Sequence, residues 1–146
     1  MKTWICDVCG KPVNEQDGWV EWIETPREDE KDVVHGLRLV HHATSCQYNR
    51  KLIYKQGGSL GDGPLENYLG VDGLILLLSM LSQHRWDEGE LLDIIQRLHI
   101  PHYEEARPFF NDGLDHIEPN LPPGYYWQDE LIKIAQSGIK SHQPAT

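Results

Sequence analysis

Alternating apolar and polar residues near the start of the chain predict a pair of strands. Residues 18–24 are rich in Trp, Val and Ile, and residues 33–41 combine β-branched residues with alternating leucines. Short segments of this kind, bounded by turn-forming residues, are typical of half-buried strands. The connection between them contains the acidic run Glu28-Asp29-Glu30, which is too charged to bury. We therefore expect a β-hairpin with an exposed loop.

A helical period replaces this alternation after the predicted hairpin. Thr44 or Ser45 can cap a first helix over residues 47–55, and Gly57-Gly58 would end it. Further along, apolar residues recur three and four positions apart in several segments. These segments are 65–69, 73–83, 87–98, 101–110 and 127–138. Their pattern predicts that the second part of the chain is mainly helical.

The segment that begins at Asp87 has the clearest amphipathic pattern. Asp87 and Glu90 resemble a capping box at the start of a helix. The apolar residues of one face are Leu91, Leu92, Ile94, Ile95 and Leu98. Asp93, Gln96 and Arg97 belong to the opposite, polar face.

A Gly-rich stretch separates the two kinds of pattern. We interpret this stretch, residues 58–63, as a linker. Residues 1–57 then form a small module of hairpin and helix, and residues 64–140 form a helical module. Residues 141–146 are expected to be a disordered tail. The predicted fold class is therefore α+β.

The composition indicates a folded but acidic chain. Of the 146 residues 39% are hydrophobic, and 5 Trp and 6 Tyr provide large side chains for a core. The 23 acidic and 13 basic residues give a formal net charge of −10. Since proteins that bind DNA or RNA gain affinity from Lys and Arg, this charge argues against a nucleic-acid partner. We expect a protein partner instead, and exposed helix faces also allow a homodimer.

The chain has no apolar stretch of the roughly 20 residues that a membrane span requires. Its longest apolar run, residues 74–81, is interrupted by Ser79 and suits a buried helix. A cysteine motif starts at position 6, which leaves no room for a secretory signal peptide. An odd number of thiols also suits a reducing compartment, so we expect a cytoplasmic protein without a membrane anchor.

The three cysteines of the chain all stand at metal-ligand spacing. Cys6 and Cys9 form a Cys-x-x-Cys-Gly motif, and Cys46 follows the pair His41-His42. Three thiolates and one imidazole complete the tetrahedral coordination of a structural Zn²⁺. A redox Cys-x-x-Cys would instead start a helix after a strand, a context that the polar turn after Cys9 does not provide. The sequence therefore predicts one zinc ion that stabilises the N-terminal module.

Either of two adjacent histidines can provide the fourth ligand. The preferred ligand set is Cys6, Cys9, His42 and Cys46. His42 is preferred because it stands four residues before Cys46 and can approach it across one turn, whereas strand alternation places His41 on the apolar side of the hairpin. His41 is the alternative ligand, and the unused histidine would hydrogen-bond a thiolate or a carbonyl.

A zinc knuckle, a β-hairpin and a helix with Cys46 in its first turn follow one another in residues 1–57. This order resembles that of treble-clef zinc fingers. The resemblance implies a zinc-built scaffold but no particular activity, because the family includes binding modules, ribosomal proteins and nucleases. The closing ligands of the family usually stand three residues apart, and the spacing in this chain is longer.

An alternative function comes from His-metal-finger endonucleases, some of which also use a treble-clef-like hairpin and helix. That resemblance would make His41 the base that activates water and Asn49 its orienting partner. No clear final histidine follows at metal-ligand spacing, and the acidic charge opposes a nucleic-acid substrate. A DNA-binding regulator meets the same electrostatic objection. We therefore expect a structural zinc protein with a role in protein interaction or regulation and no catalysis.

Overall fold

The computed structural model describes residues 2–27, 32–112 and 120–141. Within these residues two small antiparallel sheets combine with helices, which confirms the predicted α+β class. The acidic run Glu28-Asp29-Glu30 falls outside the described residues, and so do residues 142–146 of the predicted tail. Every helix among the described residues is too short or too polar to cross a bilayer.

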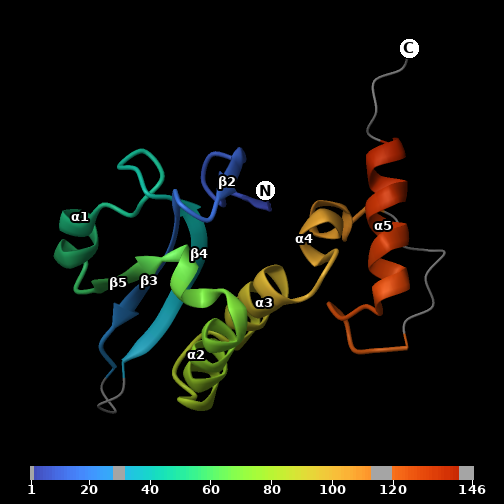
Figure 1. Cartoon of the computed structure of the whole chain (residues 1–146). Coiled ribbons are helices and arrows are strands. Elements are labelled where there is room, and N and C mark those ends of the chain that lie inside the picture. Colours follow the sequence, from blue (N-terminus) through green and yellow to red (C-terminus); the bar gives the residue numbers. More distant parts are fainter. Residues whose placement is uncertain (1, 28–31, 113–119, 142–146) are drawn as a thin grey trace. The chain divides into compact units, whose positions relative to one another are not determined.

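The strands form two sheets in the N-terminal part of the chain (Figure 1). In the smaller sheet, β1 (Thr3–Ile5) pairs with β2 (Pro12–Asn14). In the larger sheet, β3 (Gly18–Thr25) lies between β4 (Val33–His41) and β5 (Ser59–Pro64), and both of these pairs are antiparallel. The pair of β3 and β4 is the hairpin that the alternating pattern predicts.

Strand β5 occupies most of the Gly-rich stretch, and this corrects the prediction of a linker at residues 58–63. Gly61 stands opposite Trp22 of β3, and the Trp22 indole fills the space that a side chain at position 61 would take. Glycine disfavours a strand in isolation, but here its lack of a side chain lets a neighbouring ring cover the backbone. The stretch is therefore an edge strand of the sheet.

The helices differ from their predicted bounds mainly at their ends. They are α1 (Arg50–Lys55), α2 (Gly70–Ser82), α3 (Glu88–His99), α4 (Tyr103–Ala106) and α5 (Gln128–Ser141), with 3₁₀ turns η1 (Leu65–Tyr68) and η2 (Arg107–Phe109). Asn49, and neither Thr44 nor Ser45, caps α1, because its side chain accepts a hydrogen bond from Leu52 N. Asp87 caps α3 as predicted, by accepting a hydrogen bond from Glu90 N.

The chain separates into two compact units, Met1–His99 and Ile100–Thr146. In the first unit, α2 and α3 pack against the larger sheet in one core. The buried residues of this core are Trp4, Val13, Val20, Leu37, Leu39, Leu65, Tyr68, Leu77, Met80, Leu91, Ile94 and Leu98. Because strands and helices share these contacts, the structural boundary follows α3 and does not coincide with the Gly-rich stretch.

The second unit has a smaller core of its own, between α4, η2 and α5. Its buried residues are Tyr103, Ala106, Leu131, Ile134 and Ala135. The helix predicted at residues 101–110 is divided, with Pro108 inside η2. Helix α5 continues past Gly138, where the Phe109 ring occupies the space of a side chain, so this glycine serves packing and does not end the helix.

Candidate metal centre

Four side chains that can bind a metal come together where β3 begins and β4 ends. The ligand atoms of Cys6, Cys9, His41 and Cys46 all lie within 4.8 Å of one another. Cys6 and Cys46 are buried, His41 is half-buried and Cys9 is exposed. Segments far apart in the sequence thus form a single cluster that could hold a metal ion.

The turn after β1 positions the first two thiols. Cys6 N donates a hydrogen bond to the Lys11 carbonyl (2.9 Å), and Gly10 N donates one to the Cys6 carbonyl (3.0 Å). Gly10 has a φ of +74°, a left-handed conformation that residues with side chains rarely adopt. These bonds fold the backbone tightly around the Cys6 sulfur, as the Cys-x-x-Cys-Gly spacing predicts.

The end of β4 and the following turn supply the other two ligands. His41 is the last residue of β4 and pairs with Gly18 at the start of β3. Cys46 lies in a turn in which its backbone N donates to the Ala43 carbonyl (2.9 Å). Because α1 begins only at Arg50, Cys46 precedes the helix and does not lie in its first turn as predicted.

The imidazole of His41 is oriented with Nδ1 toward the thiols. Nδ1 lies 3.4 Å from the Cys9 sulfur and 3.8 Å from the Cys46 sulfur. Nε2 lies 3.0 Å from the Pro12 carbonyl oxygen, which can only accept a hydrogen bond. That bond places the ring proton on Nε2 and leaves the Nδ1 lone pair for a metal, an orientation common to metal-bound histidines.

His42 has a different role from the one that the sequence suggested. Its ring stacks on the indole of Trp19, with ring centroids 3.9 Å apart and planes 11° from parallel. The four-residue cluster contains His41, so the structure corrects the preference for His42 as fourth ligand and favours the alternative.

The electrostatics of the cluster favour a thiolate beside a protonated imidazole. Burial opposes the charged form of Cys6, but hydrogen bonds from the backbone of Cys9 and Val8 and from His41 outweigh it and lower the pKa of Cys6 to about 6. Against the effect of burial, the hydrogen bond with Cys6 raises the pKa of His41. Burial and the neighbouring Cys6 raise the pKa of the Cys46 thiol. A bound metal ion would supply the positive charge that protons supply in its absence.

The donor atoms fit a tetrahedral ion. With Zn–S near 2.3 Å and Zn–N near 2.0 Å, a tetrahedral site places sulfur and nitrogen about 3.5 Å apart. The observed separations between His41 Nδ1 and the sulfurs of Cys9 and Cys46, 3.4 and 3.8 Å, lie on either side of this value. The residues present can therefore bind such an ion with little movement, and a four-ligand set leaves no position for a substrate.

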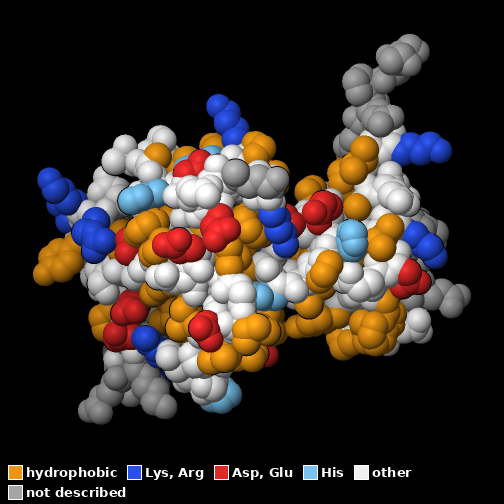
Figure 2. Space-filling view, viewed as in Figure 1, with side chains coloured by type: hydrophobic (Ala, Val, Ile, Leu, Met, Phe, Trp, Pro, Cys, Tyr) orange, Lys and Arg blue, Asp and Glu red, His pale blue; other side chains and the backbone are white. Residues whose placement is uncertain are grey.

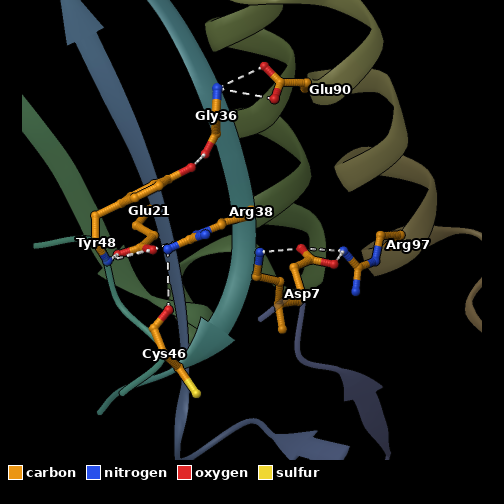
Figure 3. A network of polar contacts seen from close by, with 9 residues as sticks. Asp7, Glu21, Gly36, Arg38, Cys46, Tyr48, Glu90 and Arg97 are labelled. Carbon is orange, nitrogen blue, oxygen red and sulfur yellow. Dashed lines mark hydrogen bonds and ion pairs between the residues drawn. The ribbon is translucent and has the colours of Figure 1, made fainter. Parts of the chain in front are cut away.

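Asp7, between the first two cysteines, ties the metal-binding turn to β4 and α3 (Figure 3). Its carboxylate accepts hydrogen bonds from Leu39 N (2.8 Å) and from Arg97 Nη1 (2.8 and 2.9 Å). Arg97 also donates to the Ile5 carbonyl (2.8 Å), and its side chain is only 1% exposed. The prediction that Arg97 belongs to a polar face opposite the core was therefore wrong, and no sequence signal indicated the role of Asp7.

A second polar network holds the turn that contains Cys46. Arg38 of β4 donates to the Cys46 carbonyl (3.3 Å) and to the Glu21 carboxylate (2.7 Å). Glu21 is 2% exposed and also accepts from Tyr48 N (3.1 Å), and the Arg38 guanidinium lies 3.5 Å from the centre of the Tyr48 ring. A buried carboxylate on β3 thus fixes both ends of the segment from Cys46 to Tyr48.

The same network reaches α3 through a bulge in β4. Gly36 has a φ of +69° and falls where the pairing of β3 and β4 shifts by one residue. Its N–H, freed from the ladder, donates to the Glu90 carboxylate (2.9 Å), and its carbonyl accepts from the Tyr48 hydroxyl (2.7 Å). Figure 3 shows these contacts continuing from the Cys46 segment to α3. Both halves of the metal site are therefore anchored to the main core.

Replacing His41 with Ala is expected to reduce the bound metal sharply, because it removes the only nitrogen ligand of the cluster. Replacing His42 with Ala should leave about one ion per chain, since this neighbouring histidine stacks on Trp19. Elemental analysis of both variants, purified without added metal, measures the difference. Metal loss from the His42 variant with retention in the His41 variant would reverse the ligand assignment.

Comparison of the chain with protein-family models, with curated proteins and with solved structures found no match.

Proposed function

We propose that this chain is a zinc-organised protein-interaction module whose metal is structural. The observation that carries the proposal is the complete donor set of three sulfurs and one imidazole nitrogen within 4.8 Å of one another. Thiolate and imidazole ligands suit Zn²⁺ and are poor ligands for Mg²⁺ or Ca²⁺. A fully ligated zinc ion cannot activate a water molecule, so its contribution is to the fold.

The order of the elements around the site supports a treble-clef-like scaffold. A Cys-x-x-Cys turn, the hairpin of β3 and β4, and the short helix α1 follow one another along the chain. Two features depart from the common form of that family. His41 and Cys46 are five residues apart, and Cys46 comes four residues before α1. The proposal therefore rests on the ligand geometry, with the resemblance as secondary support.

The interaction role is supported by the surface of the first unit. Helix α2 exposes several large apolar side chains, whereas the chain as a whole carries a net charge of −10. Apolar patches on an otherwise charged surface commonly mark sites of protein interaction. A nucleic-acid partner would have to approach against this net charge.

The nuclease alternative gains no support from the two residues that the resemblance would use. Both ring nitrogens of His41 face partners, the thiols on one side and the Pro12 carbonyl on the other. The Asn49 side chain caps α1 by accepting from Leu52 N (3.1 Å). Neither side chain is placed to activate a water molecule, so we do not put this function forward.

Metal analysis and partner capture test the proposal together. The tagged chain, purified without added metal or chelator, is expected to contain about one zinc per chain. Its Co²⁺-substituted form should show the intense absorption of thiolate-to-metal charge transfer. Partners captured on the tagged chain should persist after nuclease treatment. Substoichiometric zinc, or capture of nucleic acid that nuclease abolishes, would contradict the proposal.

A further inference from the structure

Helix α2 carries an apolar face that no other described part of its own unit covers. Its inner side is buried through Gly73, Leu77 and Met80. The outer side chains include Val71, Ile75, Leu76 and Leu78, which are 76%, 57%, 39% and 50% exposed. Figure 2 shows hydrophobic side chains at the surface in the region where Figure 1 places α2. A helix that is apolar on both sides is typical of an element that is covered on both sides.

The polar groups on the outer face are few and largely satisfied within the helix. Asp72 is the only charged residue between Gly70 and Ser82. The hydroxyl of Ser79 donates to the Leu76 carbonyl (2.6 Å), and that of Ser82 donates to the Ser79 carbonyl (2.7 Å). A partner that covers this face would therefore desolvate few polar groups, which removes the main cost of burial.

We propose that this face binds a second copy of the chain, with the two α2 helices antiparallel across a two-fold axis. The inference deepens the proposed interaction module by naming its partner. Val71, Ile75 and Leu78 follow the i, i+4, i+7 spacing of one helical stripe. A two-fold axis between Ile75 and Leu78 packs Ile75 of each copy against Leu78 of the other, with Val71 at each end of the contact.

The outer face of α2 lets two copies of this acidic chain meet with little charge repulsion at the contact. Each chain has a net charge of −10, but the only charged residue between Gly70 and Ser82 is Asp72. The antiparallel arrangement also brings Asp72, near the start of one helix, toward the exposed imidazole of His84 beyond the end of the other, a group that can donate a hydrogen bond to the carboxylate. It sets the two helix dipoles in opposite directions, which is their favourable orientation.

The area of the face sets the expected strength of the dimer. The exposed apolar side chains of α2 have an accessible surface of roughly 400 Å² on each copy. Apolar patches of this size on a monomer are often functional. With the serines and Leu74 included, a symmetric pair buries about 1,000 Å², the low end for specific interfaces. We therefore expect a reversible dimer in the micromolar range.

Sedimentation of the zinc-loaded full chain, from low to high micromolar concentration, tests this inference. The mass of the wild type should rise from 16.8 kDa toward twice that value as concentration increases. Ile75→Glu should stay at the monomer mass, with association weakened at least about tenfold. Tyr54→Glu is the matched control, because Tyr54 is 77% exposed on α1 and should leave the dimer unchanged. Leu78→Glu serves as a second α2 variant if thermal unfolding shows that Ile75→Glu is misfolded.

The results also separate this inference from the proposed function. A wild-type chain that remains monomeric at every concentration, or an Ile75→Glu variant that still dimerises, would overturn the α2 dimer. A wild-type chain that stays monomeric but binds lipid vesicles through this face would also contradict the α2 dimer, because a membrane would then cover the face. If the same samples contain one zinc per chain, the zinc scaffold stands even when the dimer fails, whereas zinc-free monomers contradict both.

Discussion

Removal of the metal is expected to unfold residues 1–99 as a unit. Structural zinc contributes on the order of 10 kcal/mol to the folding of small modules. The side chains of Cys6 and Cys46 in the cluster are buried against Val40 of β4, and the polar networks around them reach α3. Chelation, or the substitution Cys46→Ser, should therefore lower the midpoint of thermal unfolding by at least about 15 °C. Near-UV circular dichroism follows this change through Trp4, Trp19 and other aromatic residues of the unit.

The His42→Ala variant is the control for this experiment, because it alters the metal-binding turn without removing a residue of the cluster. Its unfolding midpoint should stay much closer to that of the wild type, and its response to chelator should be the same. Readdition of zinc should restore the spectrum of the chelated wild type but not that of Cys46→Ser. A chelated wild type that keeps its unfolding midpoint would show that the metal does not organise the first unit.

Features that depend on residues close together in the sequence were predictable. The alternation in residues 18–24 and 33–41 gave the hairpin, because each strand has one face against the core. The Cys-x-x-Cys spacing predicted that Cys6 and Cys9 lie together, since such a turn fixes both thiols by local backbone bonds. Cys46 was predicted as the remaining thiol of the chain. Asp87 was recognised as a cap for the same reason, because its bond to Glu90 N spans a single turn.

The choice between the two histidines required contacts that are distant in the sequence. His41 faces the thiols because its Nε2 bonds the Pro12 carbonyl and its backbone pairs with Gly18. His42 turns to the other side and stacks on Trp19. Neither the register of the two strands nor the position of Pro12 can be read from the spacing to Cys46, so the spacing favoured the histidine that lies outside the cluster.

Strand β5 and Arg97 were missed because long-range packing outweighed local preference. Gly61 weakens a strand by itself, and only the Trp22 ring across the sheet makes it suitable there. Arg97 belongs to the polar residues of the α3 pattern, yet its side chain is buried. The carboxylate of Asp7 lies opposite and neutralises its charge, so the guanidinium is buried as part of an ion pair.

The substitution Arg97→Met is expected to reduce the free energy of unfolding by about 3–5 kcal/mol, because it leaves the partner of a buried ion pair without its cation. Arg97 is 1% exposed, and Asp7, 22% exposed, stands between the metal-binding cysteines. The variant should therefore also lose zinc to a competing chelator faster than the wild type. Denaturant unfolding and a zinc-transfer assay with a coloured chelator measure the two effects.

Arg50→Met is the matched control, because it makes the same change at a surface pair. Arg50 is 68% exposed and lies 3.5 Å from Asp62, so its loss should alter stability by less than about 1 kcal/mol. Adding Asp7→Asn to Arg97→Met should recover part of the lost stability, because the unpaired charge is then removed while a side-chain oxygen still accepts from Leu39 N. Equal stability of the two Met variants would mean that the Asp7–Arg97 pair does not connect the metal-binding turn to α3.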